Sequence, residues 1–348
     1  MSQMMTAARF HQAHQPLVLE QVEVPQPGPG EVLLEVQACG LCGSDLHILK
    51  GETFTGFTPI IMGHEAAGIV AELGPAVSGW QVGDRVAVNC VMSCGLCFNC
   101  QRGRDSICLE RKLIGIHVDG ALAKYVKVKA RSLVPLPDAI TFEQGAITTD
   151  AVATPYHALK ARGGLRSGDS VAIIGAGGLG SHAVKLARIM GAKPVIAVDV
   201  SPEVLARARS FGADYVVNAA NDDPVEAVAE ITKGLGVDLA LECVGSARTV
   251  TWAVQMTCVG GCAVVVGLSP ESIDLGEITP FVRKEVALMG SSAFETKEIK
   301  ELVDLAAAGR LDLSQSVSGT LSLKEINQGL ERLEKNKGDI VRLVVNSF

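Results

Sequence analysis

The chain has 348 residues, of which 48% are hydrophobic and 20% charged, so it is long enough for about two globular domains. Its formal net charge of −7 argues against nucleic-acid binding as the main function, and no segment approaches the roughly 18 consecutive apolar residues that a membrane-spanning helix needs. Residues 1–7 lack the charged and apolar pattern of a signal peptide, which predicts a cytoplasmic protein.

Alternating apolar and polar residues are the main feature of about the first 150 positions. Residues 32–36, 83–88 and 125–128 show the period of two that is typical of half-buried strands, with turn residues between the runs. Short strands of this density predict a β-rich, partly barrel-like domain.

Residue types that bind metals are spread over this first domain. Cys42 offers a thiolate, His64 an imidazole and Asp150 a carboxylate, and Glu65 adds a further oxygen donor. A catalytic zinc needs about three protein ligands and an open position. These four residues therefore form a candidate catalytic metal site.

A second cluster consists of cysteines alone. Cys94, Cys97, Cys100 and Cys108 lie in a loop of glycine and polar residues with little apolar material to bury. Four thiolates at this spacing indicate a closed tetrahedral zinc site, and the metal would supply the order of the loop. An iron–sulfur cluster is the alternative for four thiolates.

The pattern changes after Asp150, where short apolar runs alternate with helical stretches such as 202–211 and 225–232. This alternation predicts a doubly wound parallel sheet of six strands with crossover helices. The expected strands are 171–174, 195–198, 215–217, 239–242, 263–266 and 286–289.

A dinucleotide-binding motif follows the first of these strands. Gly175 suits a tight turn, Gly177 lets the backbone approach a pyrophosphate, and Gly180 lets the next helix pack on the strand. The phosphates would lie at the helix N-terminus. The second strand ends at Asp199, whose carboxylate would bond both ribose hydroxyls and repel a 2′-phosphate. The motif therefore predicts NAD rather than NADP.

The last part of the chain lies outside the nucleotide-binding pattern. Amphipathic helices over 299–308 and 323–336 and an apolar strand over 340–345 are expected there. We expect this segment to return to the first domain.

Together these motifs resemble the zinc-dependent medium-chain alcohol dehydrogenases over essentially the whole chain. The resemblance rests on segments 40–47 and 63–68, on the four cysteines, on the glycine motif and on Asp199. It implies a GroES-like catalytic domain over 1–152 with a zinc lobe at about 90–110, a Rossmann domain for NAD over 153–290, and a return to the catalytic domain over 291–348. It also implies one catalytic and one structural zinc per chain.

The family pattern implies a role for each matching residue. Cys42, His64 and Asp150 would bind the catalytic zinc, with Glu65 as an alternating ligand. The three residues that would serve catalysis beside the metal share one short segment, and they are Ser44, Asp45 and His47. Ser44 would take the proton of the substrate hydroxyl, and His47 would pass this proton on through the cofactor ribose. Asp45 would hold the ligating imidazole in the correct tautomer.

The same resemblance implies the contacts to NAD. Thr154 falls where the family contacts the nicotinamide, and Arg342 where it contacts the pyrophosphate. The complete set of predicted cofactor contacts is Gly175, Gly177, Gly178, Leu179, Gly180, Asp199, Thr154, Val244, Val266, Leu268 and Arg342.

Four positions depart from the family pattern. Asp150 stands where many members carry cysteine, and this harder ligand should leave the zinc a stronger Lewis acid. Gly43 stands where some members carry a basic residue near the pyrophosphate. Cys90 and Leu122 stand where an aromatic wall beside the substrate is common. A pocket lined by these two side chains would be wider than one built for ethanol.

The resemblance predicts the reversible oxidation of an alcohol by hydride transfer to NAD in a dry cleft between the domains. The expected wide pocket favours a secondary or cyclic alcohol. The alternatives are a dehydrogenase of alicyclic hydroxyacyl-CoA thioesters, which segment 149–156 resembles, and a polyol dehydrogenase. The expected partners are a small-molecule alcohol or ketone and further copies of the chain in a homodimer or homotetramer, with neither nucleic acid nor membrane.

A binding or sensor protein with only the structural zinc is an alternative from another functional class. Cys39, Cys243, Cys258 and Cys262 would then add redox sensitivity. The complete set of candidate catalytic ligands argues against it, and a count of two zinc ions per chain would exclude it.

Overall fold

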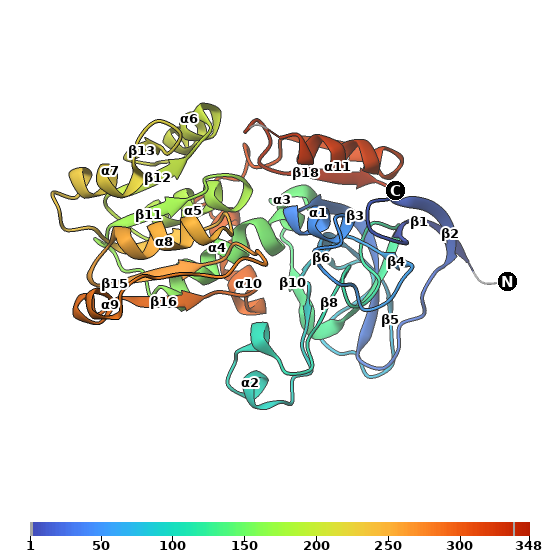
Figure 1. Ribbon diagram of the computed structural model, residues 1–348. Helices are drawn as coiled ribbons and strands as arrows, with labels where there is room; N and C mark the ends of the chain where they lie inside the picture. The colour runs from blue at the N-terminus through green and yellow to red at the C-terminus, as the bar shows by residue number, and fades with distance from the viewer. Residues whose placement is uncertain (1–2, 337) are drawn as a thin grey trace. The chain divides into compact units, whose positions relative to one another are not determined.

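The computed structural model describes residues 3–336 and 338–348, and the chain divides into two compact units. The first unit comprises Met1–Ala153, Ala293–Asn336 and Arg342–Phe348, and the second comprises Thr154–Ser292 and Lys337–Val341. Figure 1 shows the elements of each unit. No helix in the described ranges is both long and apolar enough to cross a membrane.

The first unit is built on a sheet of seven strands among the described residues, in the order β10–β6–β5–β3–β18–β17, with β9 also paired to β3. The long strands β3 (Glu31–Leu41) and β5 (Glu65–Leu73) pair antiparallel at its centre, which sets Gly40 opposite Glu65. The other strands of this sheet are β6 (Arg85–Val88), β9 (Tyr125–Lys129), β10 (Leu133–Pro135), β17 (Gly319–Ser322) and β18 (Leu343–Ser347).

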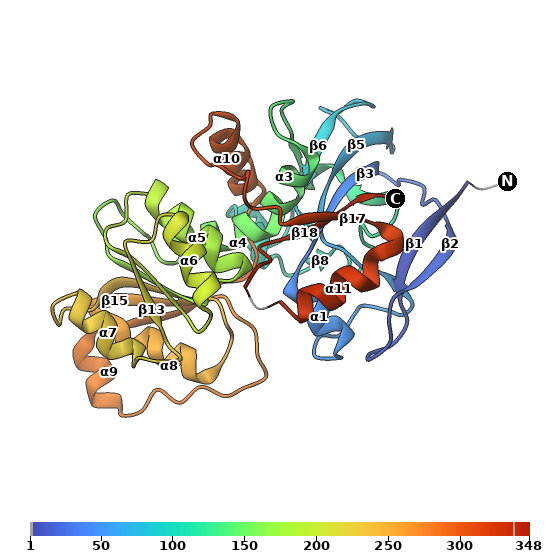
Figure 2. The ribbon, with the colours of Figure 1, turned by 90° about the horizontal axis from the view of Figure 1, so that it is seen from above.

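The end of the chain returns to this sheet. Strand β18 pairs antiparallel with β3, so that Val344 lies opposite Gly40, and Figure 2 shows the red strand beside the blue one. The strand begins three residues later than the predicted 340, because pairing with β3 starts only at Leu343 and the residues before Arg342 belong to the second unit.

Two smaller sheets and five helices complete the first unit as described. Helix α3 packs on β3 and β5, and α11 contacts α1 and β3. The small sheets contain β1 (Met4–Phe10), β2 (Val18–Glu23) and β4 (Ile60–Ile61), and separately β7 (Val91–Met92) and β8 (Lys112–Leu113). The helices are α1 (Gly43–Leu49), α2 (Phe98–Gln101), α3 (Phe142–Ile147), α10 (Thr296–Ala307) and α11 (Ile326–Glu334).

The second unit contains a parallel sheet of six strands in the described part of the chain, in the order β13–β12–β11–β14–β15–β16, as predicted. The sequences of its strands are mostly apolar because helices cover both faces of a parallel sheet. The strands are β11 (Val171–Ile174), β12 (Val195–Asp199), β13 (Tyr215–Asn218), β14 (Val237–Glu242), β15 (Thr257–Val265) and β16 (Ala287–Gly290).

The helices of the second unit form two groups. Helices α5 and α6 contact each other, and α7 and α8 contact each other, which agrees with crossover helices on two faces of the sheet. Val228 of α7 and Val254 of α8 join Ile174 and Val198 in one buried cluster. The helices are α4 (Ala153–His157), α5 (Gly178–Ile189), α6 (Pro202–Ser210), α7 (Pro224–Ile231), α8 (Ala247–Met256) and α9 (Ile278–Lys284).

Gly68 offers a test of the packing at the centre of the first unit. A Cβ atom at this position in β5 would come within 2.2 Å of the Glu35 carbonyl oxygen in β3. We expect Gly68→Ala to lower the free energy of unfolding by about 1–3 kcal/mol, because the two strands would have to separate locally. Urea denaturation would measure this loss. Gly290→Ala in β16 is the control, because its Cβ would meet no atom within 4 Å, and an equal loss in both variants would contradict the explanation.

Candidate functional site

Four side chains from three segments of the first unit meet at one point. Cys42 follows β3, His64 and Glu65 lie at the start of β5, and Asp150 lies in a π-helical turn over Thr148–Val152. One ligand atom of each residue lies within 4.8 Å of those of the others. The Cys42 Sγ atom is 3.2 Å from Asp150 Oδ2, and His64 Nε2 is 3.9 Å from the same oxygen.

This cluster fits a zinc ion. Ligand atoms about 2.0–2.3 Å from a tetrahedral zinc lie roughly 3.3–3.8 Å from one another, which is close to the observed separations. His64 is 5% exposed and Glu65 is fully buried, and Glu65 Oε2 is buried without a hydrogen-bond partner. A buried carboxylate oxygen without a donor indicates a site for a cation. Thiolate, imidazole and carboxylate are the donor types that zinc accepts in catalytic sites.

Burial raises the pKa of two of these ligands, the Cys42 thiol and the Glu65 carboxyl. The pKa of Glu65 rises to about 8. Burial lowers the pKa of His64, but Asp45, Asp150 and Cys42 together more than reverse this effect, so the His64 pKa lies well above its usual value. A divalent cation would reverse these preferences because its charge stabilises the deprotonated ligands.

Arg342 lies among the candidate ligands. It is 3% exposed, and its Nη2 atom is 2.8 Å from Glu65 Oε1 and 3.2 Å from Asp150 Oδ2. The same nitrogen is 3.5 Å from Cys42 Sγ. The guanidinium therefore balances part of the negative charge of the ligands. Its expected contact with a pyrophosphate stays a prediction. Sequence reasoning missed the observed contacts because 300 positions separate Arg342 from Cys42.

Asp45 connects two of the candidate ligands. It is fully buried, and its Oδ2 atom accepts a hydrogen bond of 2.9 Å from the Cys42 backbone N–H. Its Oδ1 atom lies 3.6 Å from His64 Nδ1. This geometry suits a carboxylate that orients the imidazole so that Nε2 faces the metal position.

Ser44 and His47 lie on α1, three positions apart. The Ser44 hydroxyl is 3.6 Å from Cys42 Sγ, so it lies at the edge of the ligand cluster. The His47 side chain is 40% exposed, and its Nδ1 atom contacts the Glu52 carboxylate. Glu52 was not predicted, although its position five residues after His47 puts it within one turn of the end of the helix.

The four-cysteine cluster is also compact. Cys97 Sγ lies 3.6 Å from Cys100 Sγ and 3.8 Å from Cys108 Sγ, and Cys94 Sγ lies 3.9 Å from Cys100 Sγ. Four sulfurs bound to zinc at about 2.3 Å would be separated by roughly 3.8 Å, so the cluster fits the ion. The backbone N–H of Cys100 and others lower the pKa of Cys97 to about 6, which favours the thiolate that zinc binds.

The glycine motif lies at the carboxyl end of β11 in the second unit. Gly175 has φ of +83°, which only glycine adopts easily. A Cβ atom at Gly180 would come within 1.9 Å of the Gly175 carbonyl oxygen, so helix α5 packs directly on the turn. A Cβ at Gly177 would meet nothing within 4 Å, which leaves the backbone before α5 open to a ligand.

Asp199 is the last residue of β12 and lies beside this turn. Its Oδ2 atom accepts a hydrogen bond of 2.9 Å from the Ala176 backbone N–H, and its Oδ1 atom accepts bonds from the backbone of Val200 and Ser201. These bonds fix the carboxylate at the carboxyl end of the sheet, where a ribose would bind.

The remaining predicted cofactor contacts differ in exposure. Val244 and Leu268 are 52% and 68% exposed, whereas Val266 and Thr154 are each 8% exposed. Val244 and Val266 follow β14 and β15, so they lie at the same edge of the sheet as Gly175.

The two expected wall residues are both buried. Cys90 is 6% exposed and Leu122 has no exposed surface. Leu122 packs against the backbone of Gly63, where an added Cβ atom would come within 2.8 Å of its Cγ atom. Of the two positions, only Cys90 can therefore widen a substrate pocket.

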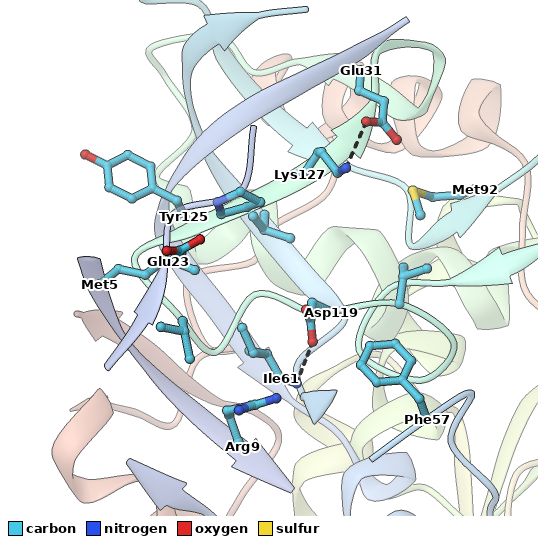
Figure 3. A pocket seen from close by; sticks show the side chains of 15 residues that line it. Met5, Arg9, Glu23, Glu31, Phe57, Ile61, Met92, Asp119, Tyr125 and Lys127 are labelled. Carbon is cyan, nitrogen blue, oxygen red and sulfur yellow. Dashed lines mark hydrogen bonds and ion pairs between the residues drawn. The ribbon is translucent and has the colours of Figure 1, made fainter. Parts of the chain in front are cut away.

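A cavity of about 510 Å³ in the first unit lies apart from these residues (Figure 3). Several of its polar groups are partnered within the protein, since Lys127 pairs with Glu31 at 3.2 Å and Asp119 accepts a bond from the Ile61 backbone. None of the predicted site residues lines it. We therefore assign the chemistry to the two metal clusters and the glycine turn.

Comparison with known families gives two matches on this chain. Residues 28–138 match the family described as alcohol dehydrogenase GroES-like domain, and residues 178–308 match the family described as zinc-binding dehydrogenase. The first match contains Cys42, His64, Glu65 and the four-cysteine lobe.

Similar proteins extend over nearly the whole chain. An alcohol dehydrogenase of Geobacillus stearothermophilus is 36% identical over 96% of this chain and 97% of its own length. An NAD-dependent alcohol dehydrogenase of Sulfurisphaera tokodaii is 33% identical over 96% of this chain and 97% of its own. The structure of acetophenone reductase from Geotrichum candidum in complex with NAD has a TM-score of 0.89 and 31% identity, and covers 100% of this chain and 98% of its own.

Zinc analysis tests the assignment of the cysteine lobe. We expect the purified protein to contain two zinc ions per chain and Cys97→Ser to contain one, because three thiolates and a hydroxyl hold the ion poorly. Atomic absorption measures the content, and thermal denaturation should show a lower midpoint for the variant. Cys90→Ser is the matched control, since this buried cysteine lies outside both clusters and should leave two ions. Two ions in Cys97→Ser would contradict the assignment.

Proposed function

The chain belongs to the zinc-dependent medium-chain alcohol dehydrogenase family, and we propose that it oxidises a secondary or cyclic alcohol to the corresponding ketone. The comparisons establish an oxidoreductase that uses zinc and NAD to interconvert alcohols and carbonyl compounds. The choice of substrate and the assignment of individual residues are our proposal.

The convergence of Cys42, His64, Glu65 and Asp150 is the observation that carries the proposal. The zinc that this donor set fits supplies a Lewis acid that stabilises negative charge on the substrate oxygen. The buried surroundings strengthen electrostatic interactions at this point, because the local dielectric constant is lower than that of water.

The residues around the ligands support specific roles. Ser44, beside Cys42, would accept the proton of the substrate hydroxyl, and His47 would pass it on. Asp45 would hold His64 in the tautomer that leaves Nε2 for the metal. Arg342 would balance part of the negative charge of the site by pairing with Glu65 and Asp150.

The second unit would bind NAD, which supplies the acceptor for the hydride of the alcohol carbon. The open backbone at Gly177 and the N-terminus of α5 would hold the pyrophosphate. Asp199 would bond the adenosine ribose, and Val244, Val266 and Leu268 would contact the nicotinamide side. On this proposal the first unit is the catalytic domain and the second is the cofactor domain.

Two observations favour a secondary or cyclic alcohol. Cys90 is smaller than an aromatic wall residue, and it lies two residues after β6 in the same unit as the candidate ligands. A protein that is similar over the whole chain is an acetophenone reductase, whose product is a secondary alcohol. A dehydrogenase of alicyclic hydroxyacyl-CoA thioesters and a polyol dehydrogenase are the alternatives that share the same metal site.

The edge of the parallel sheet favours assembly into a homodimer or homotetramer. Within the described ranges β16 pairs only with β15, so its other edge offers unpaired backbone groups. Ile278 and Val282, on the helix before this strand, are 80% and 62% exposed. A second copy of the chain would cover both features.

The cysteines favour a reducing compartment. All ten are free thiols in the structure, and seven of them are buried or belong to a candidate metal site, so that oxidation would disturb them. We propose a cytoplasmic location on this ground.

A panel of alcohols tests the proposed activity. We expect NADH formation with cyclohexanol to exceed that with ethanol by at least about tenfold in kcat/KM, because a wider apolar pocket binds the larger ring. Absorbance at the NADH band measures the rates. A clear preference for short primary alcohols would contradict the proposal, and activity only with a CoA thioester would favour the acyl-CoA alternative.

His64→Ala provides the matched test of the metal site. We expect it to lower turnover by at least about a thousandfold while NADH still binds, since the second unit is unchanged. His117→Ala, a histidine of the same unit outside both metal clusters, should retain turnover. Full turnover in His64→Ala after treatment with a chelator would exclude the catalytic assignment.

The cofactor preference depends on one carboxylate. We expect Asp199→Ala to lower kcat/KM for NAD by at least about tenfold and to raise that for NADP, because the variant loses the ribose contact and the charge that repels a 2′-phosphate. Initial rates with both cofactors measure the change. Asp222→Asn removes the same charge from an exposed position and should leave the ratio of the two cofactors unaltered. An unchanged ratio in Asp199→Ala would show that another group selects NAD.

A further inference from the structure

A buried carboxylate outside the predicted set of site residues lies at the centre of the second sheet. Glu242 is the last residue of β14 and is fully buried. It lies opposite Ile174, the residue before the glycine turn, and opposite Val265 at the end of β15. The chain order of the sheet reverses between β11 and β14. Doubly wound sheets bind dinucleotides at this reversal, outside the carboxyl ends of the strands.

Glu242 holds two neighbouring loops through hydrogen bonds. Its Oε1 atom accepts bonds of 2.7 Å and 2.8 Å from the backbone N–H groups of Val244 and Gly245 in the loop after β14. Its backbone carbonyl accepts bonds from Val266 and Gly267 in the loop after β15. One residue therefore fixes the positions of two loops that contain predicted cofactor contacts.

These loops have little freedom to relax by themselves. Gly245 has φ of +90°, and a Cβ atom there would come within 2.6 Å of the backbone of Leu268. The Val244 side chain also fills the space above the glycine turn, because a Cβ on Gly175 would lie 2.5 Å from its Cγ2 atom. A shift of the Val244 loop would therefore alter the surface on which a dinucleotide lies.

The second carboxylate oxygen of Glu242 is buried in an unfavourable environment. Glu242 Oε2 is buried and makes no hydrogen bond among the described residues. A buried acceptor without a donor is unfavourable by about 1–3 kcal/mol. The turn after β14 therefore donates two hydrogen bonds to one oxygen, while the other oxygen has no donor. A carboxylate at this position does not maximise the stability of the fold.

We propose that Glu242 is a positioning residue for the nicotinamide half of the cofactor. Its carboxylate acts by holding the Val244–Gly245 segment, which packs on the backbone of Leu268 in the loop after β15, and it touches no reacting atom. The inference rests on the proposed function, because it assumes that NAD lies across the ends of β11, β12 and β14. The adenosine half, on the side of Asp199 in β12, should be independent of Glu242.

Binding of two nucleotides to three variants tests this role. NADH probes both halves of the cofactor site, and ADP probes the adenosine half alone. We expect Glu242→Ala to raise the Kd of NADH by at least about tenfold and to leave the Kd of ADP within about twofold, because only the loop after β14 loses its side-chain acceptor. Fluorescence and calorimetric titrations measure the two constants. Glu242→Gln, which keeps one neutral acceptor, should raise the Kd of NADH by about threefold.

Thr249→Val is the matched control. The Thr249 hydroxyl lies 2.8 Å from the same Glu242 oxygen but belongs to helix α8 and not to the loops. We expect this variant to lower the thermal midpoint and to bind NADH with wild-type affinity. In steady-state kinetics Glu242→Gln should raise KM for NAD and leave KM for the alcohol unchanged.

Three results would overturn the inference. The first is unchanged NADH affinity in Glu242→Gln, which also decides the matter if Glu242→Ala does not fold. The second is an equal loss of NADH and ADP binding in the Glu242 variants, and the third is an equal loss of NADH affinity in Thr249→Val, both of which would make the role merely structural. Failure of the wild-type protein to bind either nucleotide would instead refute the proposed function itself.

Discussion

The need to balance charge in a buried cluster governs the architecture of the first unit. Glu65 and its neighbouring ligands place two carboxylates and a thiol where water is largely excluded, so cations must compensate them. The central strands are built around this requirement. Gly40 lies opposite Glu65 in the sheet, and a Cβ atom on it would come within 2.1 Å of Glu65 Oε2. On its other side Gly40 faces Val344 of β18, two residues after Arg342. Because the chain end returns to β3, the Arg342 guanidinium lies beside the carboxylates and balances part of their charge.

In the second unit the main constraint is that a ligand must reach the backbone, and charge balance is less important. Its sheet is covered by helices on both faces, so only the carboxyl ends of the strands remain for binding. At that edge the glycines remove side chains from the turn before α5, and Asp199 is held by three backbone N–H groups. In both units, therefore, the polar groups of the site lie at the ends of strands, and the paired strands hold them in rigid positions.

The sequence predicted the elements that have a local pattern and the ligand sets that have distinctive residue types, and it missed contacts that single side chains make with distant segments. The strands of the second unit were predictable because burial on both faces leaves unbroken apolar runs, and the two ligand sets because metal ligands are a short list of residue types. The contacts of Arg342 and the bonds of Glu242 had no local signal, since their partners come from other strands or from the turn geometry. The start of β15 at Thr257, six residues before the predicted one, arises from pairing with Val237 across an irregular register.

Asp150 stands where many family members carry cysteine, and its contact with Arg342 suggests what this difference does. A thiolate and a carboxylate carry the same charge, but the carboxylate has a second oxygen and accepts stronger hydrogen bonds from a guanidinium. The contact of 3.2 Å between Asp150 Oδ2 and Arg342 Nη2 takes up part of that charge. An oxygen ligand shared in this way donates less electron density to a metal than an unshared thiolate would. If Asp150 binds the zinc as we propose, the aspartate at this position and the arginine brought in by the fold would act in the same direction, toward a more electrophilic metal.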